Sequence, residues 1–327
     1  MNKIVYISMP NKNVIQVLKI NENMFFEKIQ NFKVSGNIQP INIFKEKKLL
    51  YVGLRYENKI LTLKILKDGT LKKNSEINIK YPTNHINIDF KNKILFSSSF
   101  HGDCLELYKI NKYGIPYKKY YTIHNIRGCH FSLLNNYYNL LFFTALKEDK
   151  IYYFNMSNLK KIQKNFVNFF KLGKKFGPRH CTIHSNKKIL YIINELNSTI
   201  STVKIYKNME ILQNISLLPN TEKKYWASEI QITPCSKYLF ASDRHKNIIT
   251  SFKVKKNYTL KLLKFYNTEI QPRTFKIDSS GKYLIVAGEI SNNISLYEID
   301  KKNGNLKCLI KNFFVGGNPV CAIFFDI

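Results

Sequence analysis

Long apolar runs are missing from this 327-residue chain. No uninterrupted stretch approaches the roughly 18 apolar residues of a membrane-spanning helix, and the N-terminal MNKIVYISMPNK breaks too early for a signal peptide. The six cysteines show no CxxC spacing, which argues against both a zinc knuckle and a disulfide framework. We therefore expect a cytoplasmic protein with reduced thiols and no membrane partner.

Arginine is also scarce, although the formal net charge is +30. Such a charge would suit nucleic acid if the basic residues were clustered. The lysines are instead spread along the chain, mainly at expected turns such as Lys45–Lys48, so we expect a compositional charge and no nucleic-acid partner. Lysine cannot replace the planar, two-pronged guanidinium, which makes each arginine a functional candidate. Of the 52 basic residues only five are arginine: Arg55, Arg127, Arg179, Arg244 and Arg273.

What the chain does contain is a repeat. The pattern of turn, strand, polar turn and strand recurs seven times, as in NKIVYISMPNKNVIQVLKI at 2–20 and KKILYIINELNSTISTVKI at 187–205. The central apolar residues of the seven copies are spaced 45 to 49 residues apart, and they are Tyr6, Tyr51, Phe96, Phe142, Tyr191, Phe240 and Ile285.

A second row of alternating strands precedes six of these copies, and the seventh such strand returns at the C-terminus as Pro319–Phe325. Four strands in each repeat of about 45 residues are typical of a β-propeller. We therefore predict an all-β, seven-bladed β-propeller of four-stranded antiparallel blades, formed by 1–327 as a single domain. The C-terminal inner strand should pair with the N-terminal strands and close the ring.

In such a blade the inner strand starts, and the second strand ends, on the same face. Four of the five arginines and three of the seven histidines fall in these two rows. In the hairpin within 176–200 this geometry should bring Arg179 and His180 next to Glu195, either as a strut between blades or as a site. The residues expected around one mouth of the channel are Arg55, His85, His130, Arg179, His180, Glu195, Arg244 and Arg273.

The three histidines of the row could instead bind a metal, because imidazoles suit zinc, copper or nickel. They come from different blades and no short-spaced ligand motif accompanies them. We expect no metal.

Several short motifs, in order and at the right spacing, resemble one family. They are GPRH at 177–180, NELNS at 194–198, DR at 243–244, QPR at 271–273 and SGKYLIVAG at 280–288. Together they resemble the seven-bladed propeller form of the 6-phosphogluconolactonase family over essentially the whole chain. The resemblance implies hydrolysis of 6-phospho-D-glucono-1,5-lactone to 6-phosphogluconate in the oxidative pentose phosphate pathway. Related propellers catalyse muconate lactonisation, and the positions that match their suspected residues are His130, Arg179, Glu195 and Arg244.

Opening a lactone requires a base for water, a donor for the oxyanion and, here, cations for the phosphate. We expect His130 or Glu195 as the base and Arg179 beside the oxyanion. Arg244 and Arg273 should bind the phosphate, and His85, His180 and Arg55 should add substrate contacts. No GxSxG nucleophile motif is present, and we expect no cofactor and a monomer. A muconate-type cycloisomerase and a noncatalytic scaffold for a protein partner remain alternatives.

Overall fold

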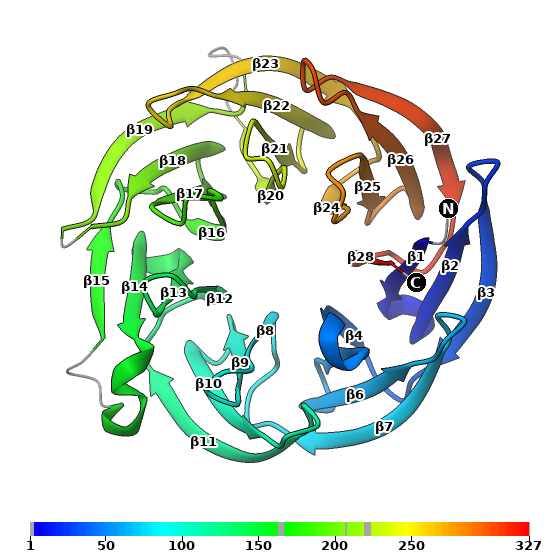
Figure 1. Cartoon of the computed structure of the whole chain (residues 1–327), viewed down its shortest axis with the longest axis horizontal. Coiled ribbons are helices and arrows are strands. Elements are labelled where there is room, and N and C mark those ends of the chain that lie inside the picture. Colours follow the sequence, from blue (N-terminus) through cyan, green and yellow to red (C-terminus); the bar gives the residue numbers. More distant parts are fainter. Residues whose placement is uncertain (1–2, 163–166, 207, 219–223, 327) are drawn as a thin grey trace.

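The computed structural model describes residues 3–162, 167–206, 208–218 and 224–326, and these residues form a ring of β-sheets (Figure 1). Within this part of the chain there are seven sheets, each of four antiparallel strands. The seven-bladed β-propeller predicted from the repeats is therefore confirmed.

From the innermost strand outward, the first three sheets contain β28 (Cys321–Asp326), β1 (Lys3–Met9), β2 (Val14–Ile20) and β3 (Phe26–Lys33); β4 (Ile38–Phe44), β5 (Leu49–Leu54), β6 (Lys59–Ile65) and β7 (Leu71–Asn78); and β8 (His85–Asp89), β9 (Ile94–Ser99), β10 (Cys104–Ile110) and β11 (Pro116–His124). Short 3₁₀ turns add η1 (Pro10–Lys12), η2 (Lys45–Lys47), η3 (Leu146–Glu148) and η4 (Met156–Lys161).

The other four sheets contain β12 (Cys129–Asn135), β13 (Leu140–Ala145), β14 (Lys150–Asn155) and β15 (Asn168–Lys171); β16 (Pro178–Ile183), β17 (Ile189–Asn194), β18 (Thr199–Lys204) and β19 (Glu210–Ser216); β20 (Ala227–Ile232), β21 (Tyr238–Asp243), β22 (Ile248–Val254) and β23 (Leu260–Asn267); and β24 (Pro272–Ile277), β25 (Tyr283–Gly288), β26 (Asn293–Ile299) and β27 (Leu306–Phe314).

The repeated apolar residues are the centre of the packing between blades. Each lies in the second strand of its blade, where every residue of strands such as β5, β17 and β25 is buried. Both faces of these strands are covered because each blade packs against a neighbour on either side. All seven repeat residues are fully buried: Tyr6, Tyr51, Phe96, Phe142, Tyr191, Phe240 and Ile285.

Where the repeat residue is tyrosine, its hydroxyl also joins adjacent blades. Tyr6 donates to the carbonyl of Gly69 at 2.7 Å, and Tyr51 donates to the carbonyl of Gly114 at 2.5 Å. Gly69 and Gly114 lie in the turn between the third and fourth strands of the following blade. The tyrosine ring thus packs in the apolar layer between blades, while its hydroxyl finds a hydrogen-bond acceptor in the next blade.

The two ends of the chain close the ring, as predicted. Strand β28 pairs antiparallel with β1, with Tyr6 opposite Ile323. The strand begins at Cys321 rather than at the predicted Pro319, since proline has no backbone N–H to donate to the ladder. Lys3 reinforces the junction through ion pairs to Asp326 at 2.5 Å and to Asp278 at 2.8 Å.

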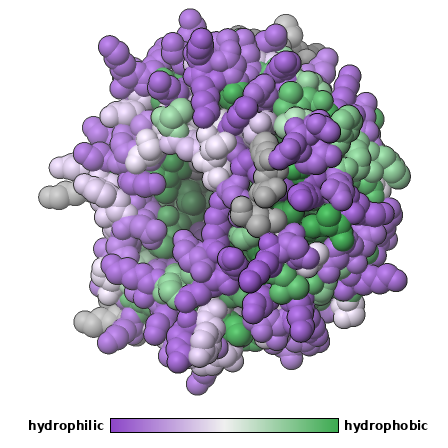
Figure 2. All heavy atoms as spheres, turned by 45° about the vertical axis from the view of Figure 1, so that its right-hand side comes forward, coloured by the Kyte–Doolittle hydropathy of each residue, from purple (hydrophilic) through white to green (hydrophobic). Residues whose placement is uncertain are grey.

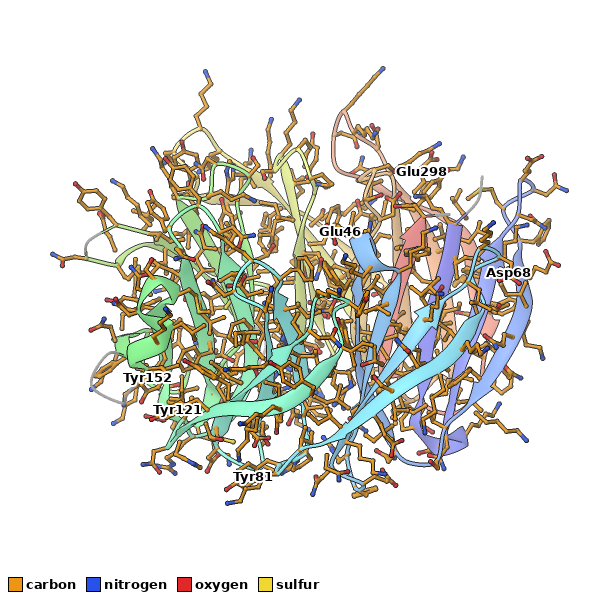
Figure 3. The ribbon with its side chains drawn as sticks, turned by 60° about the horizontal axis from the view of Figure 1, so that its bottom comes forward. Glu46, Asp68, Tyr81, Tyr121, Tyr152 and Glu298 are labelled. Carbon is orange, nitrogen blue, oxygen red and sulfur yellow. The ribbon has the colours of Figure 1, made fainter. Side chains whose placement is uncertain are left out.

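The two faces of the ring differ in which strand ends they carry. Tyr81, just before inner strand β8, and Glu46, just after inner strand β4, lie at opposite faces in Figure 3. The starts of the inner strands therefore share one face. No helix among the described residues is long and apolar enough to cross a membrane, and hydrophilic side chains predominate on the surface seen in Figure 2. All six cysteines lie in the described ranges and are free thiols.

Candidate active site

Five inner strands begin with a local break in register, and these breaks position the side chains of the site. In β16, Pro178 pairs with Asn194 and His180 with Ile193, so Arg179 is an extra residue without an opposite partner. In β24 the extra residue is Arg273, and in β12 and β20 two residues, His130 with Phe131 and Ser228 with Glu229, stand opposite a single residue of the second strand. A β-bulge re-aims the side chain that it carries, which is why such bulges are common beside active sites.

The bulged residues and their neighbours line a cavity at the centre of the ring. Its charged wall residues are Arg179, Glu229, Arg273 and Lys276, and its wall also contains the imidazoles of His85, His130 and His180 together with the ring of Phe131. The rings pack closely, with centroids of His130 and His180 5.1 Å apart and those of His85 and His180 6.2 Å apart. The structure thus brings the three histidines of the predicted row together.

The hairpin β16–β17 places Arg179 beside Glu195. The backbone N–H of Glu195 donates to the carbonyl of Gly177 at 2.8 Å, which holds the two strand ends together. Gly177 has φ +64°, a left-handed conformation that favours glycine, and a Cβ there would lie 2.5 Å from Leu196. Arg179 Nε lies 2.9 Å from Glu195 Oε2, as an ion pair without the alignment of a hydrogen bond.

The rest of the Arg179 guanidinium is fixed from two sides. Nη1 donates to the carbonyl of Ser228 at 2.6 Å and lies 3.3 Å from His180 Nε2. Nη2 has no hydrogen-bond acceptor among the residues that the structure describes. Burial lowers the pKa of this guanidinium, and the Glu195 carboxylate opposes that effect. Arg179 therefore offers a fixed donor at the wall of the cavity.

His180 is paired with a carboxylate from the next blade. Its Nδ1 lies 3.1 Å from Glu229 Oε1, and Glu229 also accepts from Gln231 Nε2 at 3.0 Å. The other oxygen, Oε2, lies 3.7 Å from Lys276 Nζ. Burial alone would raise the pKa of Glu229, but Lys276 and His180 outweigh it and lower the pKa. Burial lowers the pKa of His180 to about 4 despite Glu229.

His85 has a different partner. The backbone N–H of Ser132 donates to His85 Nδ1 at 3.3 Å. A neutral imidazole that accepts at Nδ1 carries its proton on Nε2. Burial lowers the pKa of His85 well below its ordinary value, and the ring stacks 4.0 Å from that of Phe131. His85 is therefore a neutral hydrogen-bond donor at neutral pH.

His130 has no such anchor at Nδ1. This nitrogen is buried and lacks a hydrogen-bond partner in the described chain. Burial, followed by the positive charge of Arg179, lowers the pKa of the ring well below its ordinary value. His130 is thus neutral at neutral pH, and it stands between the Phe100 ring, 6.2 Å away, and His180.

Glu195 and Arg244 stand behind Arg179. Arg244 Nη2 donates to Glu195 Oε2 at 2.8 Å, the same oxygen that faces Arg179. The Arg244 guanidinium lies over the ring of Trp226 at 4.0 Å and donates to the carbonyl of Ala227 at 3.2 Å. Nε and Nη2 thus donate to protein groups, and Arg244 is only 6% exposed.

Arg273 and Arg55 form a separate basic pair. Arg273 lines the cavity, and its Nη1 lies 3.1 Å from both oxygens of Glu289. Burial, followed by the like charge of Arg273, lowers the pKa of Arg55. Arg55 Nε is buried and has no hydrogen-bond partner within the described residues. Glu289 pairs with Arg273 and attracts Arg55 electrostatically, so these two guanidinium groups and one carboxylate leave one net positive charge for an anion.

Two wall residues were missed as candidates from the sequence, Glu229 and Lys276. Glu229 occupies the same row as His130 and His180, and this shared position was a usable signal. Lys276 follows Thr274 by two residues on β24, so strand alternation places both side chains in the cavity wall. Lysine is so common in this chain that its presence there was no signal by itself.

The site as a whole is positively charged. Its cations are Arg55, Arg179, Arg244, Arg273 and Lys276, and its carboxylates are Glu195, Glu229 and Glu289. Five cations and three carboxylates leave two net positive charges when the histidines are neutral. Across the described residues, no group of three or more His, Cys, Asp or Glu side chains is arranged to hold a metal ion.

Comparison with known proteins places this geometry in context. The model of the family described as "Lactonase, 7-bladed beta-propeller" matches residues 4–324. The chain is 40% identical to a 6-phosphogluconolactonase of Buchnera aphidicola subsp. Schizaphis graminum, with 100% of both chains covered. It is 33% identical to a 6-phosphogluconolactonase of Xenorhabdus nematophila, with 98% of both covered.

Solved structures share the fold at lower identity. The periplasmic gluconolactonase of Pseudomonas aeruginosa superposes with a TM-score of 0.88 at 16% identity, and 99% of each chain is covered. A protein from Lactobacillus plantarum superposes with a TM-score of 0.88 at 20% identity over 100% of both chains. The fold, the family match over 4–324 and these relatives together show that the chain belongs to the seven-bladed β-propeller lactonase family.

Proposed function

We propose that this protein hydrolyses 6-phospho-D-glucono-1,5-lactone to 6-phosphogluconate, the lactonase step of the oxidative pentose phosphate pathway. The observation that carries the proposal is a cavity with neutral imidazoles, a fixed guanidinium and two net positive charges. The names of the full-length curated relatives support the same substrate.

The lactone end of the substrate belongs beside Arg179. When water attacks the carbonyl carbon, negative charge develops on the carbonyl oxygen, and a preorganised donor stabilises it. Arg179 Nη2 is the guanidinium nitrogen left for that task, since Nε faces Glu195 and Nη1 donates to Ser228. His85 Nε2–H is a second donor in the same wall.

The phosphate end belongs beside Arg273 and Arg55. Guanidinium groups bind phosphate oxygens through paired, charge-assisted hydrogen bonds, which lysine cannot reproduce. The two net positive charges of the site complement a phosphate dianion. Arg244 is not part of the cavity wall and directs Nε and Nη2 at Glu195 and the backbone, so in this proposal it supports the site from behind.

The base that activates water is an imidazole of the wall. Glu195, the other candidate from the sequence, directs Oε2 at the guanidinium groups of Arg179 and Arg244, so these two partners already occupy that oxygen. His130 and His180 are both neutral at neutral pH and both line the cavity. Because water is the nucleophile, the proposed reaction needs no cofactor and no covalent enzyme intermediate.

We further propose that residues 1–327 act as one propeller domain and as a cytoplasmic monomer, with the phosphorylated lactone as the small-molecule partner. The lysines of the chain are spread over turns rather than gathered into one strip, which supports the absence of a nucleic-acid partner.

The test is hydrolysis of freshly prepared 6-phosphogluconolactone by the purified protein, followed as proton release after subtraction of the uncatalysed rate. Unphosphorylated glucono-1,5-lactone is the matched control substrate. We expect rapid hydrolysis of the phosphorylated lactone and a much lower kcat/KM for the control. A folded protein that accelerates neither reaction would favour the noncatalytic scaffold.

A further inference from the structure

The interaction between His180 and Glu229 determines which ring nitrogen carries the proton. An ionised carboxylate only accepts hydrogen bonds, so the contact of 3.1 Å between Nδ1 and Oε1 requires the proton to be on Nδ1. A guanidinium only donates, so Arg179 Nη1 at 3.3 Å likewise requires a lone pair on Nε2. Two independent neighbours therefore select the same tautomer of His180.

The carboxylate itself is held firmly. Glu229 is 3% exposed, and its Oε1 accepts from the side chain of Gln231 and from the backbone N–H of Ile230. Its own backbone N–H donates to Ser242 Oγ at 3.1 Å. These contacts come from β20 and β21, so one blade presents the carboxylate and the preceding blade presents the imidazole.

The three imidazoles of the wall are consequently not equivalent. His180 presents a lone pair at Nε2, whereas His85 presents a proton at Nε2 because Ser132 donates to its Nδ1. His130 has neither a carboxylate partner nor any partner at Nδ1 among the described residues. Of the three, His180 alone combines an acceptor nitrogen at Nε2 with a carboxylate that can stabilise the imidazolium.

We propose that His180 is the proton acceptor of the hydrolysis and that Glu229 is the positioning residue that acts through it. This inference rests on the proposed function and deepens it by assigning the base. Glu229 has two effects in this role. It holds the tautomer with the lone pair on Nε2, and its negative charge stabilises the ring when Nε2 becomes protonated.

The step balances as follows. The oxygen of water bonds to the lactone carbonyl carbon, the carbonyl electron pair moves to oxygen beside Arg179, and His180 Nε2 takes the water proton. When the tetrahedral intermediate collapses, the bond from that carbon to the ring oxygen breaks, and the departing alkoxide takes the proton back from Nε2. The new carboxylic acid then ionises and releases one proton.

The charges facing His180 set how readily it accepts that proton. Glu229 from β20 favours protonation, while Arg179 from β16 and Lys276 from β24 oppose it. The rings of His130 and His85, from β12 and β8, face it from the other side. The contact from Arg179 Nη1 to Nε2, at 3.3 Å, is longer than its hydrogen bond to Ser228, at 2.6 Å. Nε2 can thus exchange this contact for water while Arg179 stays in place.

The first experiment reads the tautomer directly, by ¹⁵N NMR of the histidine side chains in the intact protein at pH 7. We expect His180 protonated on Nδ1 and His85 protonated on Nε2, with assignment from His180→Gln and His85→Gln. In Glu229→Gln the preference of His180 for Nδ1–H should weaken. This measurement needs no turnover, so it remains informative whatever substrate the protein uses.

The second experiment measures hydrolysis of 6-phosphogluconolactone. Glu229→Gln should lower kcat by about 10²-fold and leave KM nearly unchanged, within the range expected for general base catalysis. Glu106→Gln is the matched control because Glu106 is another buried carboxylate beside a lysine, Lys119 at 3.6 Å, but lies on β10 away from the cavity. The kcat of His180→Gly should fall further than that of Glu229→Gln, and added imidazole should restore part of it.

Three results would overturn the assignment: a His180 resonance with the proton on Nε2, a kcat of Glu229→Gln equal to that of Glu106→Gln, or a His180→Gly enzyme with normal kcat. Imidazole rescue of His130→Gly but not of His180→Gly would move the base to His130. A wild-type protein without lactonase activity would refute the proposed function itself. The NMR measurement of the His180 tautomer would still show whether His180 and Glu229 are paired as described.

Discussion

Replacement of Arg179 by lysine tests whether this guanidinium is part of the site or only a strut between blades. The side chain now contacts Glu195 through Nε at 2.9 Å and Ser228 through Nη1 at 2.6 Å, which leaves Nη2 for the substrate. A lysine has one nitrogen and cannot serve all three positions. The Arg179→Lys protein therefore keeps its charge but loses the fixed donor at the cavity.

The expected loss follows from that geometry. Removal of one oxyanion donor lowers kcat on the order of 10²- to 10³-fold, or about 2.7–4 kcal/mol of transition-state stabilisation. KM should change little, since the carbonyl oxygen carries its full charge only in the transition state. The carbonyl of Ser228 also loses its donor, which costs about 1–3 kcal/mol of folding stability if it stays unsatisfied.

Arg244→Lys is the matched control, because Arg244 pairs with the same oxygen of Glu195 from the side away from the cavity. It should lose comparable stability as the contacts with Trp226 and Ala227 weaken, but its kcat should fall less than that of Arg179→Lys. Thermal unfolding and lactone hydrolysis are measured side by side on both proteins. Equal stability losses with equal, small changes in kcat would mean that Arg179 is a strut and would refute its role at the oxyanion.

Four further predictions use other parts of the molecule. Deletion of 319–327 should leave the edge of β1 unpaired and abolish cooperative unfolding by circular dichroism; a melt like that of the full chain would contradict closure. Arg273→Ala should raise KM for the phosphorylated lactone at least tenfold while the KM of unphosphorylated lactone stays the same, and parallel changes would argue against a phosphate site. The pKa of His180 is about 4 in the folded protein and 6.5 in the unfolded chain, so the unfolded chain binds more protons between these two pH values. The free energy of unfolding measured with urea should therefore be highest above pH 6.5 and should fall as the pH decreases toward 4. Prolonged chelation should leave turnover intact, and a loss restored by one particular ion would make the histidine row a metal site.

The sequence alone was sufficient for the architecture. Seven apolar residues recur at a near-constant spacing, and each marks a strand that must be covered on both faces, so their number sets the number of blades. Closure was also predictable, because the missing first inner strand reappears at the C-terminus and leaves no strand unpaired. The alternation of strand direction then assigned Arg179, His180 and Glu195 to a single face.

The sequence could not separate residues at the cavity from those behind it. Both Arg179 and Arg244 belong to the predicted rows, yet Arg179 lines the cavity while Arg244 lies over Trp226 and points at Glu195. Arg179 is the extra residue of a β-bulge at the start of the inner strand β16, and a bulge re-aims its side chain, whereas Arg244 follows the second strand β21 of its blade. Periodicity in the chain does not reveal where such a bulge falls.

Only the tertiary structure determined which titratable side chains lie in contact with one another. His180 and Glu229 are 49 positions apart and lie on different blades, and their contact depends on the angle at which two blades pack. The same holds for Lys276, whose type is too common in this chain to be informative until its ammonium is found 3.7 Å from that carboxylate. Local patterns determine strands and their faces because those are set by near neighbours along the chain. The tautomer and charge of a buried imidazole are set by neighbours in space, and these exist only once the ring has closed.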